Sequence, residues 1–486
     1  MQKKYISDVI TTKEIKKWQP GNRILVCSQT GSGKSEVIKT GLYDYAKTMG
    51  KKILLMSNRN LLKNQNIVDI GSKKDVIKVH NYQEYESRIL GGLDIDELFR
   101  PFDYVVYDES HYFFSDSQFN RNTDLLISPI KATPADKIFI FMTATPDALL
   151  DYQSDYDYVY NLPQDYSYID NIYFYNMNEK SSVVEAIIQN APQEDKILYF
   201  GSNAEDIWRL STHFPNDAAF ICSSSNKMAD KSSAEAIADI VNHARFSPRI
   251  LFSTKVLDNG VNLKDENLKH VIIDISDPIS FIQTMGRKRC LSAKERITLY
   301  VRNYHKGMLF YIIKGLRTKI KMVEDYNKLL PIDFRNKYSL RDSDNLFDDN
   351  YNLNHSRYQH YLTQKRLLET MFYDDGKNGY KNYICKLLNF PVENTRDANK
   401  DFERISIKDL MEKYLGVKMF KDDQEKFKLL FFDKIFTPKK TEYIARGIKA
   451  ANGILEEDGL DYKIYSRQEF KNINKNKTYW IVEKQI

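Results

Sequence analysis

Residues 28–35 read Ser28-Gln29-Thr30-Gly31-Ser32-Gly33-Lys34-Ser35, between the apolar run 24–27 and a helix-like segment. A buried strand that enters a glycine-rich turn and then a helix presents backbone N–H groups to an anion, so this stretch predicts a phosphate cradle. The pattern G-x-x-x-x-G-K-[ST] is met except at its first position, where Ser28 replaces glycine. Lys34 would reach the β- and γ-phosphates of a nucleotide and Ser35 would ligate Mg²⁺, while Thr30, Gly31, Ser32 and Gly33 would line the cradle. A chance glycine-rich loop is the alternative.

The composition is that of a soluble globular protein. The chain has 486 residues, of which 42% are hydrophobic and 28% charged, enough for two or three domains. Its four cysteines lie far apart without a C-x-x-C pair, which argues against zinc sites and disulfides. No apolar run approaches the length of a membrane span, and the N-terminus lacks the apolar core of a signal peptide. We therefore expect a cytoplasmic protein without a membrane partner.

Positive charge is concentrated in the last third of the chain. Residues 301–486 contain 36 Lys and Arg against 27 Asp and Glu, a net +9, so the first 300 residues carry −3 of the total +6. A basic region of this kind favours binding to a polyanion such as nucleic acid. A solvated charged surface explains the charge equally well.

Short apolar runs alternate with helix-like segments along the first 300 residues. The runs predict strands at 23–28, 51–58, 102–108, 137–143, 196–201, 249–253, 268–275 and 296–302. Such alternation predicts parallel sheets covered by helices on both faces, and two sets of strands predict two α/β domains. We place the domains at 1–165, 166–302 and 303–486, with the linker within 151–175 and a mainly helical, basic third domain.

A second nucleotide signal lies at the end of the predicted strand 102–108. There the chain continues Asp108-Glu109-Ser110-His111. A carboxylate at this end of a strand beside a phosphate loop is placed to hold Mg²⁺, so we assign that role to Asp108. Glu109 would act as the general base that polarises the attacking water. The alternative is a solvated Asp-Glu turn.

With the phosphate loop, the D-E-x-H sequence resembles motif II of the superfamily 2 helicases, DExH branch (DEAD/DEAH-like). Further stretches fall in the family's order over residues 20–300. Residues 57–65 resemble motif Ia, 143–145 motif III, 253–262 motif V and 283–289 motif VI. The resemblance implies two tandem RecA-like domains that hydrolyse ATP with Mg²⁺ in the cleft between them. It also implies nucleic-acid contacts through Arg59, Gln65, Thr143, Thr145, Thr254 and Asn262, the last standing where the family usually has Asp.

The resemblance also implies the roles of residues that approach the nucleotide from the second domain. Gln283 opens motif VI and is expected to meet His111 across the interdomain cleft. Arg287 is expected to be the arginine finger and Gly260 to lie near the nucleotide. Arg289 is expected to lie near the nucleotide as well; a structural or nucleic-acid contact is its alternative. The family's final motif VI arginine would fall at position 290, where this chain has Cys290.

The end of the chain predicts a helix at 441–455 followed by strands at 462–465 and 478–482 around a basic, Asn-rich turn. This order resembles a winged-helix module, whose aromatic residues could stack on bases; a hairpin that caps the helical domain is the alternative. The sequence as a whole predicts a helicase or translocase on DNA or RNA. The alternative function is a nucleic-acid-sensing ATPase switch that recruits a protein through residues 303–486 with little unwinding.

Overall fold

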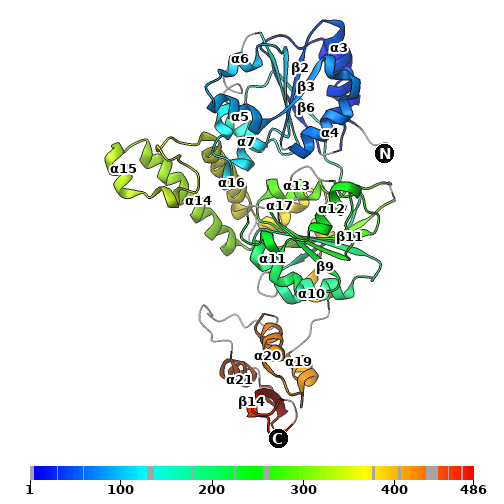
Figure 1. Ribbon diagram of the computed structural model, residues 1–486, viewed down its shortest axis with the longest axis vertical. Coiled ribbons are helices and arrows are strands. Elements are labelled where there is room, and N and C mark those ends of the chain that lie inside the picture. The colour runs from blue at the N-terminus through cyan, green and yellow to red at the C-terminus, as the bar shows by residue number, and fades with distance from the viewer. Residues whose placement is uncertain are drawn as a thin grey trace.

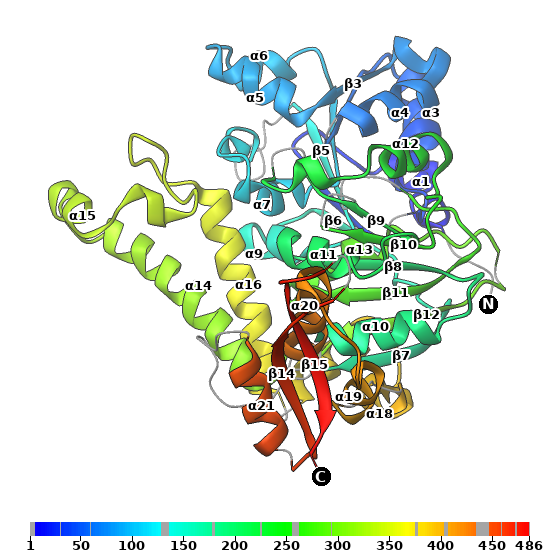
Figure 2. The same cartoon turned by 60° about the horizontal axis from the view of Figure 1, so that its bottom comes forward.

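The structure is a computed structural model that describes residues 5–29, 31–58, 60–127, 136–176, 180–223, 226–254, 262–292, 294–374, 378–402, 407–433, 447–457, 459–471 and 474–485. Two α/β lobes lie one above the other, a helical arm projects beside them, and a small module lies beyond the second lobe (Figure 1). Figure 2 shows the same parts with the C-terminal module in front of the second lobe.

The first lobe is built on a parallel sheet in the order β3-β2-β4-β5-β1-β6. Its strands are β1 Arg23–Cys27, β2 Ile53–Ser57, β3 Ile77–Asn81, β4 Tyr104–Asp108, β5 Ile138–Thr143 and β6 Tyr158–Asn161. Strands β2, β4 and β5 are buried along their whole length, as expected where helices cover both faces. Cys27 lies beside Thr143 and Asp108 beside Met142, so the loops after β1, β4 and β5 leave the sheet at one edge.

Short helices pack on both faces of this sheet, and apolar side chains form a separate cluster on each face. These helices are α1 Thr12–Ile15, α2 Lys34–Val37, α3 Tyr43–Thr48, α4 Asn60–Ile70, α5 Tyr82–Leu90, α6 Ile95–Phe99, α7 Tyr112–Ser115 and α9 Asp147–Tyr152. Helices α2 and α3 are joined by the π-helical turn Ile38–Leu42, so one helical path leads away from the phosphate loop.

The second lobe contains a parallel sheet in the order β13-β7-β12-β11-β8-β10-β9. Its strands are β7 Ile169–Tyr175, β8 Lys196–Gly201, β9 Ala218–Ile221, β10 Ile250–Ser253, β11 Leu268–Asp274, β12 Ile297–Arg302 and β13 Arg396–Asp397. Its helices are α10 Lys180–Asn190, α11 Ala204–Ser211, α12 Ala234–His243 and α13 Pro278–Met285. The two sheets confirm the predicted pair of tandem RecA-like α/β domains and contain all eight predicted strands.

The predicted linker is more ordered than its sequence suggests. Strands β6 and β7 both fall within 151–175, and only residues 162–168 connect the two sheets. Strand β6 lies at the sheet edge with a mixed burial pattern, and Val159 is exposed while Tyr160 is buried. An edge strand with an outward apolar residue gives a weak alternation, which is why the sequence reads as a linker.

The region 303–486, predicted as one C-terminal domain, divides into two parts. Its first part contains α14 Lys306–Tyr326, α15 Pro331–Lys337, α16 His355–Tyr373, α17 Gly379–Leu387 and α18 Ala398–Asp401. Apolar residues of α14, α16 and α17 belong to the same buried cluster as those of sheet strands β7, β11 and β12. This part therefore extends the second lobe, and β13 adds a strand to its sheet.

The helical arm, residues 306–373, also contacts the first lobe. The Asp124 carboxylate accepts hydrogen bonds from the backbone N–H groups of His355 and Ser356 (2.5 and 2.6 Å) at the start of α16. Further along α16, Arg366 pairs with Asp147 (3.1 Å) and Asp151 (3.0 Å) on α9. The arm thus packs into one lobe and is hydrogen-bonded to the other.

The second part, the C-terminal module of residues 407–485, has its own buried core. It consists of α19 Ile407–Tyr414, α20 Lys421–Lys428, α21 Ile448–Glu457, β14 Tyr462–Gln468 and β15 Thr478–Lys484. Strands β14 and β15 are antiparallel, and Met419 exchanges two backbone hydrogen bonds with Trp480. Helix α19, the bridge at Met419, helices α20 and α21 and the β14–β15 hairpin follow one another along the chain, and the hairpin packs against the module's own helices. Among the described residues, no helix is both long and apolar enough to cross a bilayer.

A chain that ends at Phe402 is expected to keep both lobes folded, because the C-terminal module is stabilised by a separate core. Circular dichroism should show a cooperative melt with a midpoint within about 5 °C of that of the full chain. Aggregation of the shortened chain, or a much larger fall in the midpoint, would mean that the module supports the lobes.

Candidate nucleotide site between the lobes

The phosphate loop follows β1 and begins the helical path of α2. Gly31 and Gly33 have φ angles of +82° and +88°, in the left-handed region that favours glycine. The buried Lys34 ammonium donates to the carbonyl oxygens of Ser28 (2.6 Å) and Gln29 (3.3 Å). Ser28, which departs from the glycine of the pattern, is buried and accepts a hydrogen bond from the Ser32 hydroxyl (2.7 Å). The Ser28 side chain therefore stabilises the loop through this buried hydrogen bond.

Asp108 ends β4 and Glu109 follows it, at the edge of the sheet where the phosphate loop leaves. Asp108 is buried, and burial together with the neighbouring Glu109 raises its pKa to about 6, against the opposing charge of Lys34. Glu109 has a φ of +53°, which turns its side chain out of the strand line. Burial would raise the pKa of Glu109, but Lys34, His111, Arg287 and Arg289 together hold it below its ordinary value. Glu109 is thus kept ionised and able to accept a proton.

His111 links the carboxylates to the end of β5. Its Nδ1 lies 3.4 Å from the Glu109 Oε2 and 3.3 Å from the Thr143 hydroxyl. Burial lowers the pKa of His111 to about 4, so the imidazole is neutral at pH 7. The Thr143 hydroxyl in turn accepts from the backbone N–H of Thr145 (3.0 Å). Both threonines are buried, and Thr143 connects His111 to the backbone of Thr145. Their nucleic-acid contacts stay predictions.

The second lobe supplies two arginines from the segment that follows α13. The buried Arg287 donates through Nε to the Gln283 carbonyl (3.1 Å), one helical turn before it. Arg289 donates through Nε to the Asn262 side-chain carbonyl (2.7 Å) and through its backbone N–H to Leu263 (2.9 Å). Asn262, predicted as a nucleic-acid contact, therefore positions Arg289.

These arginines reach the first lobe. A Cβ atom placed on Gly31 would lie 2.8 Å from the Arg289 Nη1, so the guanidinium lies directly against the phosphate loop. Burial and the nearby Arg287 lower the pKa of Arg289 to about 10. Both arginines also lower the pKa of Glu109. The cleft thus brings cations of one lobe against the carboxylate and the loop of the other.

The expected pairing of His111 with Gln283 is not seen. His111 turns toward Thr143 and Glu109, and the buried Gln283 Nε2 has no hydrogen-bond partner within the part of the chain that the structure describes. The direction of these side chains depends on how the lobes meet, which motif spacing does not determine.

Other predicted site residues are placed only in part. Thr254 follows β10, its backbone N–H bonded to the Ile221 carbonyl (3.2 Å). Gln65 lies in α4, and its side chain is not among those described. Thr30, Arg59 and Gly260 lie outside the described residues, so their roles stay predictions.

Tyr82 also contacts the candidate site, although the sequence gives no indication of this. Its hydroxyl donates to the Asp108 carbonyl (2.6 Å), and its ring stacks on that of Tyr112 with centroids 4.6 Å apart. It begins α5, far from motif II in sequence, so no local pattern indicates this contact.

The donor set fits Mg²⁺. Asp108 supplies a buried carboxylate whose ionised form is disfavoured by Glu109, and a bound dication would relieve that repulsion. Ser35 is the second residue of α2, beside the phosphate loop, where a hydroxyl oxygen suits a hard cation.

No protein-family model matches the sequence, and no curated protein matches it either. Solved structures do show likeness. Dbp5 of S. cerevisiae, bound to RNA and ADP-BeF3, is similar over 60% of this chain and 83% of its own, with 15% identity and a TM-score of 0.44. The E. coli DEAH/RHA helicase HrpB is similar over 60% of this chain and 42% of its own, with 14% identity and a TM-score of 0.40.

Replacing Gly31 with alanine should lower ATP turnover at least about tenfold, because the added methyl group displaces the Arg289 guanidinium. Gly50→Ala is the matched control: Gly50 also has a positive φ, +66°, but nothing lies within 4 Å of its added Cβ. Equal turnover in the two variants would contradict the contact between Arg289 and the loop.

Replacing Asp108 with asparagine should stabilise the metal-free protein at pH 7.5. Because the pKa of Asp108 is raised, the folded state ionises this carboxyl less readily than the unfolded chain does. This difference lowers the free energy of unfolding by on the order of 1–3 kcal/mol above pH 6. This cost fades as the pH falls from 6 toward 4, where both states are protonated. Thermal melts in EDTA should therefore show a higher midpoint for the variant at pH 7.5 and a smaller gain at pH 5. The exposed Asp155→Asn serves as control, and a lower midpoint for Asp108→Asn at pH 7.5 would refute the assignment.

Proposed function

We propose that this protein is a nucleic-acid-dependent ATPase of the superfamily 2 helicase type, which hydrolyses ATP between its two lobes. The observation that supports it most is the approach of Arg287 and Arg289 from the second lobe to Glu109 and Gly31 of the first. A site completed by cations from another lobe is typical of enzymes that transfer phosphoryl groups under conformational control.

Each residue of the candidate site has its own proposed role in ATP hydrolysis. The backbone N–H groups of the loop and the Lys34 ammonium would hold the β- and γ-phosphates. Glu109 would take a proton from the attacking water, and its lowered pKa keeps it in the basic form. Arg287 would stabilise the charge that develops on the γ-phosphoryl oxygens, an effect of about 10³ to 10⁵ in rate. Asp108 and Ser35 would hold Mg²⁺, which supplies charge neutralisation at the phosphates.

Closure of the lobes therefore assembles the site. With the lobes apart, Glu109 would lose both arginines and the γ-phosphate would lose its cation from the second lobe. If loops of each lobe grip nucleic acid in turn, each cycle of closing and opening becomes a step along the strand. The proposed nucleic-acid contacts are two loops. One follows Ser57 at the end of β2 in the first lobe, and the other includes Thr254 in the second lobe.

The C-terminal module offers a further nucleic-acid contact. Its winged-helix order and the lysines of its hairpin turn, Lys471, Lys475 and Lys477, are consistent with phosphate binding. The alternative function, a nucleic-acid-sensing ATPase switch that recruits a protein with little unwinding, draws its support from the separate core of this module.

ATP turnover should rise with nucleic acid in the wild type and fall about 10³-fold in Glu109→Gln and Arg287→Ala, because each loses a group that acts on the γ-phosphoryl transfer. Turnover is measured without nucleic acid and with single-stranded DNA, duplex DNA or RNA at stated salt. ATP binding, measured with a fluorescent analogue, should be retained in Arg287→Ala.

The control is Arg209→Ala, which removes a surface arginine on α11 paired with Glu205. Normal turnover in Arg287→Ala would rule out its role as the finger. Strand displacement by catalytic amounts of enzyme would favour a helicase, and stimulation without displacement would favour a translocase or the switch.

A further inference from the structure

Glu109 has a backbone conformation that residues other than glycine rarely adopt, with a φ of +53°. Such a conformation persists where the surrounding structure holds the peptide groups on both sides of it. The peptide after Glu109 is held through the Ser110 N–H, which donates to the Met142 carbonyl (2.9 Å). The peptide before it is held through the Asp108 carbonyl, which accepts from the Tyr82 hydroxyl (2.6 Å). The direction of the Glu109 side chain therefore depends on a hydrogen bond from another side chain.

Tyr82 has little freedom to move away from this hydrogen bond. It is fully buried at the start of α5. Its ring is stacked on the ring of Tyr112, with centroids 4.6 Å apart, and on that of Tyr107, with centroids 6.1 Å apart. Burial raises the pKa of the Tyr82 hydroxyl well above its ordinary value, so this hydroxyl keeps the proton that it donates. The stack therefore holds a permanent donor against the Asp108 carbonyl.

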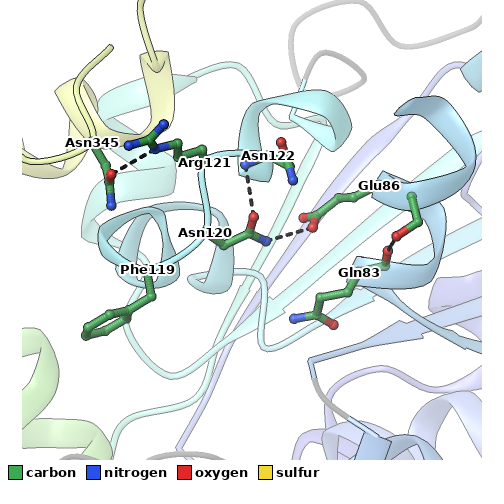
Figure 3. A pocket seen from close by; sticks show the side chains of 8 residues that line it. Gln83, Glu86, Phe119, Asn120, Arg121, Asn122 and Asn345 are labelled. Carbon is green, nitrogen blue, oxygen red and sulfur yellow. Dashed lines mark hydrogen bonds between the residues drawn. The ribbon is translucent and has the colours of Figure 1, made fainter. Parts of the chain in front are cut away.

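A buried polar network holds the neighbouring ring of Tyr112. The Tyr112 hydroxyl donates to the Glu86 carboxylate (3.0 Å) and accepts from the side-chain amides of Gln83 (3.1 Å) and Asn120 (2.7 Å). Asn120 also donates to the second Glu86 oxygen (2.7 Å), as Figure 3 shows. Gln83, Glu86 and Asn120 line a pocket of about 520 Å³ where the first lobe meets the helical arm. Because these bonds fix Tyr112, they also fix the ring of Tyr82 that is stacked on it.

We propose that Tyr82 is a positioning residue of the ATPase site: its hydroxyl fixes the peptide between Asp108 and Glu109 and so directs the Glu109 carboxylate toward the attacking water. This inference rests on the proposed function, in which Glu109 is the general base. The phosphates are assigned to other groups, the loop N–H groups and Lys34. Loss of the Tyr82 hydroxyl should therefore slow the chemical step without weakening ATP binding.

The test measures ATP turnover of the full chain at saturating Mg²⁺, with and without nucleic acid. In Tyr82→Phe, kcat should fall about tenfold while KM for ATP stays within about twofold, because the base is misdirected but the phosphate contacts remain. Tyr82→4-aminophenylalanine places an N–H donor where the hydroxyl was. This variant should return kcat to within about threefold of the wild type, because the bond to the Asp108 carbonyl is made again.

A double-mutant cycle separates action through Glu109 from a general effect on the lobe. In the Glu109→Gln background, Tyr82→Phe should change kcat by less than about twofold, because the carboxylate that the hydroxyl directs is already gone. A further loss of about tenfold in the double variant would overturn the proposal, since Tyr82 would then act on another group.

Tyr300→Phe is the matched control. Tyr300 is a buried tyrosine in the core of the second lobe, and its hydroxyl is hydrogen-bonded to Nδ1 of His270 (3.1 Å). The control loses a buried hydroxyl of the same kind, so its kcat and KM should match those of the wild type. Circular dichroism should show a cooperative melt for both Phe variants, because each keeps its ring and loses one oxygen atom.

The remaining outcomes separate this proposal from the one on which it rests. A wild-type kcat in Tyr82→Phe, or a kcat that 4-aminophenylalanine does not restore, would overturn the role of Tyr82 and leave the proposed ATPase intact. A kcat that is regained by raising Mg²⁺ would also overturn it, because the hydroxyl would then act through the metal ligand Asp108. Wild-type turnover in Glu109→Gln would overturn the proposed function itself.

Discussion

Buried charges of opposite sign face each other across the cleft, and the arrangement of both lobes depends on them. Glu109 lies among Lys34, Arg287 and Arg289, and each of these charged groups would be costly to bury without the others. The first lobe therefore needs the second to compensate its carboxylate, and the second needs the first to compensate its arginines. Asn262 adds a neutral amide oxygen for Arg289, which holds the guanidinium without reducing the positive charge that a nucleotide requires.

The parallel sheets make this juxtaposition possible. Because β1, β4 and β5 are neighbours in one direction, the phosphate loop, the two carboxylates and the Thr143 turn emerge together. Backbone hydrogen bonds from Ser28 to Thr143 (3.0 Å) and from Ser110 to Met142 (2.9 Å) continue the ladder into these loops. In the second lobe, the segment that follows α13 directs two arginines to one place, so a few rigid elements determine the site's geometry.

The sequence predicts the parts of the site whose geometry is local. Gly31 and Gly33 have the positive φ angles that their positions predict, and β1, β4 and the start of α2 lie where the apolar runs and the helix-like segment predict them. The pairing of His111 with Gln283 depends on lobe closure, and the bond from Arg289 to Asn262 joins two separate loops, so neither follows from spacing. Residues 303–402 read as part of a C-terminal domain at 303–486 because their helices are amphipathic, but the surface that buries their apolar faces belongs to the second lobe. The pocket lined by Gln83 of α5 and Asn345 of the helical arm joins segments far apart in sequence, so no sequence pattern predicts it.

The helical arm restricts how the two lobes can move relative to each other. The chain passes from one lobe to the other through residues 162–168, and α16 makes a second attachment at Asp124, Asp147 and Asp151. Two attachment points define a line, and two bodies joined at two points turn most easily about that line. With one connection the lobes could move in many directions relative to each other, whereas with two connections their main relative motion is a hinge rotation. While α16 stays docked, opening and closing of the cleft must follow this single rotation, and release of α16 would give the lobes their remaining freedom.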